Sequence, residues 1–199
     1  KDFLQMEIGQ SIHLPFQDPL VDVYDPIPGD GQAILFAAPS EDVQKIVGIL
    51  LDLNLVPEAA DIRALCNLRL LERLDMLADD RTYLIADWSI NELSICIYSN
   101  GQVEFLRFQS IDTDMTKWKP EMHVGFDVHY TYNGDIQDYR MHVTDQVLEL
   151  DRMMNFFKFS LHKGEKSVNE LILMGDNPIL ETISDFLSDN LATPIKLLT

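Results

Sequence analysis

The hydrophobic pattern of the first sixty residues alternates between the helical and the strand period. Apolar residues recur at helical spacing over residues 1–12, and two prolines in LPFQDP predict that this helix ends there. LVDVYDPI alternates apolar and polar residues, as a half-buried strand does, and AILFAAP is an apolar run of strand length. PGDGQ between them predicts a hairpin turn.

A long helix is predicted after the second strand. Ser40 is a favourable N-cap and Asn54 a suitable stop. The apolar residues between them have helical spacing: Val43, Ile46, Val47, Leu50 and Leu51. PEAADIRAL then predicts a further strand, and ALCNLRLLERLDML predicts another helix.

The middle of the chain predicts a meander of three strands, at 82–88, 92–98 and 102–108. Asn100-Gly101 favours a two-residue hairpin, because both positions tolerate a positive φ angle. Residues 110–143 are polar and aromatic, and they predict a loop followed by a hairpin over 123–143.

Two amphipathic helices and two strands are predicted to complete the chain. Thr144 caps the first helix, which carries one apolar stripe, and NELILMG predicts a buried strand. Asn177 and Pro178 suit the N-cap and first turn of the second helix, and PIKLL closes as a strand. The fold class is therefore α/β (α+β), with the helices 144–162 and 177–190 covering a mixed sheet.

Composition and charge limit the classes of partner that the protein is expected to bind. The 199 residues have a net charge of −18, which disfavours nucleic acid and an anionic membrane surface and favours basic or apolar protein segments. No stretch approaches the roughly 18–20 apolar residues of a membrane span, so no direct membrane insertion is expected. Cys66 and Cys96 suit reduced, buried thiols of a cytosolic protein, although one disulfide between them remains an alternative. The missing initiator Met indicates a piece of something longer.

The order of elements resembles one lobe of the actin-like (ribonuclease H-like) ATPase fold. The first third resembles the PilM family of type IV pilus assembly proteins, on Ile12–Phe16, Asp22, Ala37-Ala38, LNLVP and AADI. Its small strand–helix–strand module is similar to one in FtsA, the actin relative of cell division. YSNGQVEFLRF and ELDRMMNFF match the second lobe of the family.

This resemblance covers most of the chain except 110–143 and implies three parts. Residues 1–62 would be a small inserted subdomain and residues 63–80 a connecting helix. Residues 81–199 would be an actin-like lobe with a variable insertion at 110–143.

The resemblance also implies where a nucleotide would bind. Actin-like proteins hold ATP between two hairpins and a Gly-rich turn, and the first hairpin would lie before Lys1. The second normally carries Asp-x-Gly for close backbone approach, whereas this chain has Asp87-Trp88-Ser89. The Trp88 indole and the Ser89 side chain are therefore expected to lie where a phosphate would need clearance. The Gly-rich turn keeps only Gly175, and Asp176 places a repelling carboxylate at a helix N-terminus.

Asp87 and Gly175 are therefore predicted to be remnants of a degenerate nucleotide site. No cofactor is expected, unless a missing N-terminal segment completes a site for ATP. The alternative for Asp87 is that it caps a turn.

No other catalytic or metal site is predicted. Asp112-Thr113-Asp114 begins like a calcium loop but lacks the required Gly and Glu, so a solvated loop is expected. The histidines of the insertion, His123, His129 and His142, have no cysteine partners nearby, which disfavours a metal site.

Two functions of different classes follow. The resemblance implies a cytoplasmic scaffold of a type IV pilus or a related secretion or competence platform, held under the inner membrane by the cytoplasmic tail of a PilN-like protein. The GspL cytoplasmic domain of type II secretion is a variant of this function. The alternative is an active actin-like ATPase or sugar kinase, which the degenerate phosphate features disfavour.

The candidate partner-binding residues are Leu14 and Phe16, in the Pro-stiffened HLPF segment near the predicted junction of the two lobes. The alternative is that both side chains fill the core of the small lobe. Self-association of the chain is left open.

Overall fold

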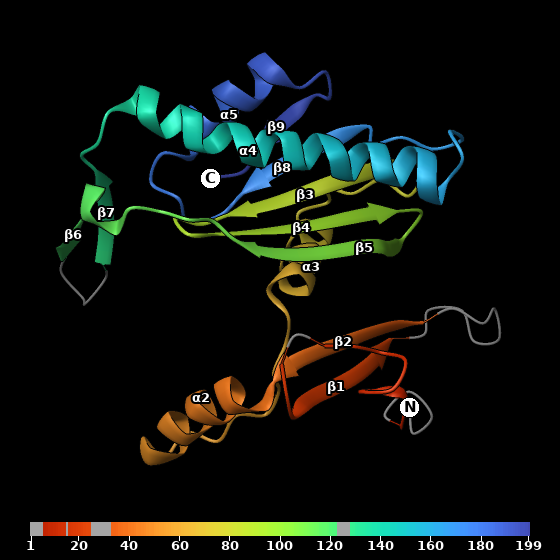
Figure 1. Ribbon diagram of the computed structural model, residues 1–199, viewed down its shortest axis with the longest axis vertical. Helices are drawn as coiled ribbons and strands as arrows, with labels where there is room; N and C mark the ends of the chain where they lie inside the picture. The colour runs from red at the N-terminus through yellow and green to blue at the C-terminus, as the bar shows by residue number, and fades with distance from the viewer. Residues whose placement is uncertain (1–5, 15, 25–32, 123–127) are drawn as a thin grey trace. The chain divides into compact units, whose positions relative to one another are not determined.

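The chain divides into two compact units, Lys1–Asp61 and Ile62–Thr199 (Figure 1). The computed structural model describes residues 6–14, 16–24, 33–122 and 128–199. The predicted PGDGQ turn, at 28–32, and His123 lie outside these residues, as do the first five residues of the predicted N-terminal helix.

The first unit consists of a hairpin and a helix. Strands β1 (Pro19–Tyr24) and β2 (Ile34–Pro39) pair antiparallel, as the sequence predicts. Helix α2 (Ser40–Asp52) follows β2 directly. Ser40 is the first helical residue and not the predicted cap, because its hydroxyl donates a hydrogen bond of 2.7 Å to the Asp18 carboxylate.

Two predictions for this unit are wrong. The N-terminal helix does not reach residue 12, since a turn over residues 9–11 brings Ile8 and Ile12 together in an isolated bridge. The segment 57–65 forms no strand: residues 55–62 are irregular, and helix α3 (Arg63–Arg73) begins inside the segment.

The second unit is built on a five-stranded mixed sheet of order β5-β4-β3-β8-β9. The meander β3 (Thr82–Trp88), β4 (Glu92–Ser99) and β5 (Gln102–Ser110) is antiparallel, as predicted. Asn100 and Gly101 have φ angles of 53° and 75°, which the tight hairpin turn requires. Strands β8 (Glu170–Met174) and β9 (Ile195–Leu197) continue the sheet parallel to β3.

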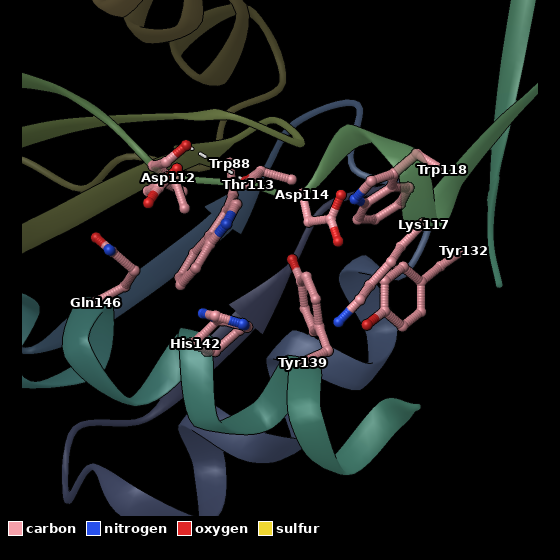
Figure 2. A pocket seen from close by; sticks show the side chains of 12 residues that line it. Trp88, Asp112, Thr113, Asp114, Lys117, Trp118, Tyr132, Tyr139, His142 and Gln146 are labelled. Atoms are coloured by element: carbon pink, nitrogen blue, oxygen red, sulfur yellow. Dashed lines mark hydrogen bonds between the residues drawn. The ribbon is translucent and has the colours of Figure 1, made fainter. Parts of the chain in front are cut away.

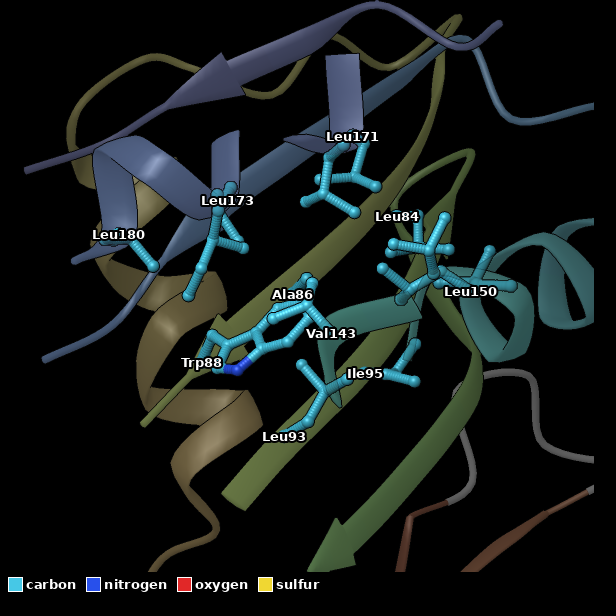
Figure 3. Close-up of a cluster of buried hydrophobic side chains, with 14 of the residues drawn as sticks. Leu84, Ala86, Trp88, Leu93, Ile95, Val143, Leu150, Leu171, Leu173 and Leu180 are labelled. Atoms are coloured by element: carbon cyan, nitrogen blue, oxygen red, sulfur yellow. The ribbon is translucent and has the colours of Figure 1, made fainter. Parts of the chain in front are cut away.

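Helices cover both faces of this sheet (Figure 1). Helices α4 (Ile136–Asn155) and α5 (Leu180–Asn190) pack on one face, where Leu84, Ala86 and Trp88 point (Figure 3). Helix α3 packs on the other face through Ala64, Leu68 and Leu71, against the alternate residues of the same strands. Because β3 is buried on both faces, its middle residues, 83–86, are all apolar.

The insertion folds differently from its prediction. Its hairpin consists of β6 (Trp118–Met122) and β7 (Val128–Tyr132), after a short 3₁₀ turn, η1 (Met115–Lys117). Helix α4 begins at Ile136 and not at Thr144, because the Asp135 carboxylate caps it by accepting a 2.7 Å hydrogen bond from the Gln137 amide. Thr144 lies within the helix, and a π-helical segment, η2 (Phe156–Leu161), extends it.

Helix α5 also starts later than predicted. Its first residue is Leu180, and Asn177 lies in the turn that precedes it. Asn177 still satisfies a backbone donor before the helix, since its side-chain oxygen accepts from the Ile179 amide at 3.1 Å.

Both cysteines are free thiols, so the alternative of a disulfide is wrong. Cys96 is buried, as predicted, whereas Cys66 is exposed. Burial raises the pKa of the Cys96 thiol to about 12, because the surrounding core disfavours the thiolate.

Candidate functional site

The candidate site consists of two turns that lie side by side at one end of the sheet. One joins β3 to β4 and contains Ser89, and the other joins β8 to α5 and contains Gly175 and Asp176. The parallel pairing of β3 with β8 brings their carboxyl ends together, with Asp87 opposite Met174. Carboxyl ends of neighbouring parallel strands are a common place for ligands in α/β proteins.

Asp87 is buried and fully engaged by helix α3. Its carboxylate accepts hydrogen bonds from Arg63 Nε at 2.6 Å, from Arg63 Nη2 at 2.9 Å and from Asn67 Nδ2 at 2.6 Å. Arg63 and Asn67 are four residues apart, so both project from the same face of the first helical turns. Asp87 therefore ties the sheet to α3, and the alternative that it caps a turn is wrong.

Arg63 concentrates the positive charge of this region. It pairs with Asp87 and also lies 3.6 Å from the Asp176 carboxylate and 4.0 Å from that of Glu92. Partial burial lowers the pKa of Arg63. The charges of the three carboxylates and the hydrogen bonds to Asp87 together raise it by more, so the net shift of the Arg63 pKa is upward. With three carboxylates around one guanidinium, the local field disfavours an added polyphosphate.

Gly175 provides the close contact between the two turns. Its φ angle is +132°, and a Cβ atom built there would lie 2.4 Å from the carbonyl oxygen of Trp88. The backbone of the second turn thus lies directly against the backbone of β3. In this structure Gly175 allows a close contact between two backbone segments of the chain, at the position where the family resemblance implies a nucleotide.

Hydrogen bonds fasten the two turns to each other. The Ser89 hydroxyl donates to the Asp176 carboxylate at 2.6 Å. Asn177 is 4% exposed, and its side-chain amide donates to the Ser89 carbonyl at 3.0 Å and to the Tyr139 hydroxyl at 3.2 Å. The Asn177 backbone amide donates to the Trp88 carbonyl at 3.2 Å. The arrangement closes the space between the turns with polar contacts of the protein itself.

The position of Trp88 corrects one expectation. Its side chain is 1% exposed and packs in the core beside Leu93 and Ile95 (Figure 3), so the indole does not project into the space between the turns. The steric obstacle near Gly175 is the Trp88 backbone.

Two hollows flank this cluster, and Arg63 lines both. One, of about 600 Å³, lies toward Ser89 and the hairpin β6–β7, and the other, of about 400 Å³, lies toward Asp87, Gly175 and the chain end. Both are large enough for a small molecule. Asp176 also lines both, so an anionic ligand in either hollow would meet a carboxylate that is 75% exposed.

A separate pocket lies between α4 and the segment 111–118 (Figure 2). Its walls are aromatic: the ring centroids of Trp118, Tyr132 and Tyr139 lie 4.9–5.9 Å apart, and the Trp88 indole forms another wall. Burial raises the pKa of the Tyr139 hydroxyl to about 12, and the hydrogen bond from Asn177 opposes this shift. The pocket offers apolar surface and lacks a cradle for phosphate.

The Asp112–Asp114 segment behaves as a solvated loop. Both carboxylates are exposed, and that of Asp114 accepts hydrogen bonds from the Thr116 hydroxyl at 2.6 Å and the Thr116 amide at 3.1 Å. These bonds lower the pKa of Asp114. Among the described residues, no three His, Cys, Asp or Glu side chains group closely enough to hold a metal ion.

The sequence-predicted site residues fall in different units. Asp87 and Gly175 come together at the two turns of the second unit. Leu14 and Phe16 are half-buried in the first unit, on either side of residue 15, which lies outside the described residues. The structure adds Arg63 and Asn67, which the sequence analysis missed because it placed Arg63 in a strand.

Within the described residues, no helix is both long and apolar enough to cross a lipid bilayer. No protein-family model matches the sequence, and no curated protein sequence matches it.

Solved structures do match the fold. A chain of the PilM–PilN type IV pilus biogenesis complex superposes with a TM-score of 0.70 at 17% identity, covering 100% of this chain and 61% of that one. A protein of unknown function with an actin-like ATPase fold, from Bacteroides thetaiotaomicron VPI-5482, superposes with a TM-score of 0.50 at 12% identity, covering 98% of this chain and 59% of that one. The chain thus spans about three fifths of the length of either neighbour, and its fold is the α/β, actin-like fold that the sequence predicts.

Proposed function

We propose that this protein is a scaffold of a type IV pilus assembly platform, which binds the cytoplasmic segment of a PilN-like inner-membrane protein. The observation that carries the proposal is the superposition of the whole chain on a chain of the PilM–PilN complex. The partner would hold the protein at the cytoplasmic face of the membrane.

The charge of the first unit supports this kind of partner. Residues 1–61 contain eleven Asp or Glu residues and two Lys or Arg residues. Segments just cytoplasmic of a membrane span are commonly basic, so they would be attracted to this unit. Leu14 and Phe16 remain the residues proposed to receive apolar side chains of the tail.

The test is a pull-down of the intact protein with the cytoplasmic tails of membrane proteins from the same pilus operon. We expect one tail to bind, with an affinity that falls as salt rises. Phe16→Ala should weaken binding about tenfold, equivalent to about 1.4 kcal/mol. Leu55→Ala is the matched control, because Leu55 is a 54% exposed apolar residue of the same unit. If no tail binds, or if Phe16→Ala binds like wild type while retaining its fold, the proposal for these residues is wrong.

We further propose that the two turns of the second unit do not bind ATP. Asp87 is neutralised by Arg63 and held by Asn67, and Ser89 is committed to Asp176. A phosphate would have to displace these contacts and approach three carboxylates.

Calorimetric titration with ATP and magnesium checks this proposal. We expect no saturable heat at millimolar nucleotide. A micromolar dissociation constant would favour the alternative of an active actin-like ATPase. Arg63→Ala should be titrated in parallel and should bind no better than wild type, because removal of the guanidinium leaves the carboxylates of Asp87, Glu92 and Asp176 uncompensated. A gain of binding in this variant would contradict the argument from charge.

A further inference from the structure

Strand β5 forms one edge of the five-stranded sheet. Within the part of the chain that the structure describes, β5 pairs with β4 alone, so one row of its backbone groups has no strand beside it. The strand has nine residues, whereas β9 at the opposite edge has three. A long, unpaired edge is a template for a further strand.

The register identifies which residues face outward. The Ile111 amide donates to the Asn91 carbonyl at 2.7 Å, immediately beyond the end of the β4–β5 ladder. Backbone groups of an antiparallel strand point alternately toward and away from its partner. Gln109 and Arg107 therefore direct their N–H and C=O groups toward β4, and Leu106, Phe108 and Ser110 direct theirs away from it.

This part of the edge lacks the usual protection. Natural edge strands carry Pro, Lys or bulges that discourage pairing. Residues 105–110 include no Pro and no Lys, and their one charged residue, Arg107, is paired with Glu149 of α4 at 2.8 Å. The irregularity in the β4–β5 register lies at the other end of the strand, at Ile97/Tyr98. Phe108 is 61% exposed in the middle of the unprotected stretch.

The two faces of the edge differ in character. Leu106 packs with the α3 cluster, so Phe108, two residues later, lies on the same, apolar face. On the opposite face, Arg107 and Gln109 line a hollow of about 410 Å³ with the α4 residues Glu149 and Arg152. Alternate side chains of a strand added here would therefore contact the apolar face and the polar hollow in turn.

We propose that β5 is a docking edge for an extended peptide segment of another protein, which joins the sheet as a sixth strand. The segment alternates apolar and polar residues, to match the two faces, and carries a net positive charge. Residues 62–199, the unit that contains this edge, have 22 Asp or Glu residues and 13 Lys or Arg residues. This excess of negative charge sets the preference, because it attracts a basic segment and opposes docking of a second copy of the chain. This surface is distinct from Leu14 and Phe16 and does not depend on the proposed function.

Amide hydrogen exchange of the intact, free protein, followed by NMR, tests the register. The amides of Leu106, Phe108 and Ser110 should exchange at least tenfold faster than those of Arg107 and Gln109. Protection of the Phe108 amide in the free monomer would show that the edge is already covered, and would overturn the proposal.

Binding is tested by fluorescence anisotropy with the labelled peptide Lys-Val-Thr-Val-Lys-Val-Thr-Val-Lys. Two control peptides carry Pro at the third Val or Glu at every Lys. We expect the first peptide to bind and to protect the three outward amides, and both controls to bind at least tenfold more weakly. Failure of the first peptide to bind, or equal binding of the Pro peptide, would contradict strand addition.

Variants at one position separate backbone from side chain. Phe108→Pro removes the outward N–H and should weaken peptide binding at least tenfold. An edge strand tolerates proline at such a position, because the missing N–H makes no hydrogen bond within the sheet. Phe108→Ala keeps that N–H and should weaken binding less. Thermal unfolding of both variants checks that they are folded. If Phe108→Pro is unstable, the Pro and Glu control peptides still test strand addition on the wild-type protein. Unchanged binding by a folded Phe108→Pro, or a wild-type dimer that this substitution dissociates, would overturn the proposed occupant.

Discussion

Gly175→Ala is expected to lower the free energy of unfolding by about 2–5 kcal/mol, through steric overlap and backbone strain together. The new Cβ would lie 2.4 Å from the Trp88 carbonyl oxygen and 2.7 Å from the Trp88 nitrogen. These atoms belong to the central strand β3, so they have little freedom to move away. The φ angle of +132° is a further cost, because L-residues rarely adopt it.

Gly164→Ala is the matched control for this substitution. Gly164 also has a positive φ angle, +90°, but a Cβ atom there would have no neighbour within 4 Å. It should therefore cost only the backbone strain, about 1 kcal/mol. Urea denaturation of both variants measures the difference. Equal, small losses would mean that the two turns separate readily, and the space between them would then be open to a ligand.

Elements with a strong local signal were predicted from the sequence. The meander 82–108 contains three runs of strand length that are rich in apolar residues, and it carries Asn100-Gly101, whose positive φ angles select one turn. The apolar run 171–174 was predicted to lie in a buried strand, and it forms most of β8. The order of these elements was sufficient to identify the actin-like fold, which the solved structures confirm.

Elements whose apolar residues are compatible with both a helix and a strand were not predicted correctly. Residues 136–143 have apolar positions compatible with a strand, but Tyr139 and Val143 are four apart and are buried on one face of α4. Residues 57–65 were likewise predicted as a strand, although no partner strand is present for them among the described residues. Tertiary packing, and not the local period, decides between helix and strand at such positions.

The candidate site shows the consequence of that ambiguity. Asp87 and Gly175 could be located because a family pattern exists for them. Arg63 and Asn67 could not, because their relation to Asp87 depends on α3 starting at Arg63 and packing on the sheet. The one available signal was the spacing of an Arg and an Asn four residues apart, and it applies only if the segment is a helix.

Arg63→Ala is expected to destabilise the second unit by about 2–4 kcal/mol, because it leaves a buried carboxylate without its counter-ion. Asp87 is 4% exposed, and Asn67 would remain as its only described hydrogen-bond donor. Asp87→Asn should cost less, about 1 kcal/mol, since Arg63 is 44% exposed and can be solvated. Lys45→Ala removes an exposed ion pair with Glu41 and should cost less than about 0.5 kcal/mol.

The double variant Arg63→Ala/Asp87→Asn distinguishes the ion pair from its surroundings. When Asp87 no longer carries a charge, removal of Arg63 should lower the free energy of unfolding by less than it does in the single variant. The double-mutant cycle should therefore give a favourable coupling of about 1–3 kcal/mol. Urea denaturation of the four proteins at neutral pH supplies the cycle. A coupling near zero would mean that Asp87 does not depend on Arg63. The carboxylate at the end of β3 would then be available to other cations, which is the property that a nucleotide site with bound magnesium requires.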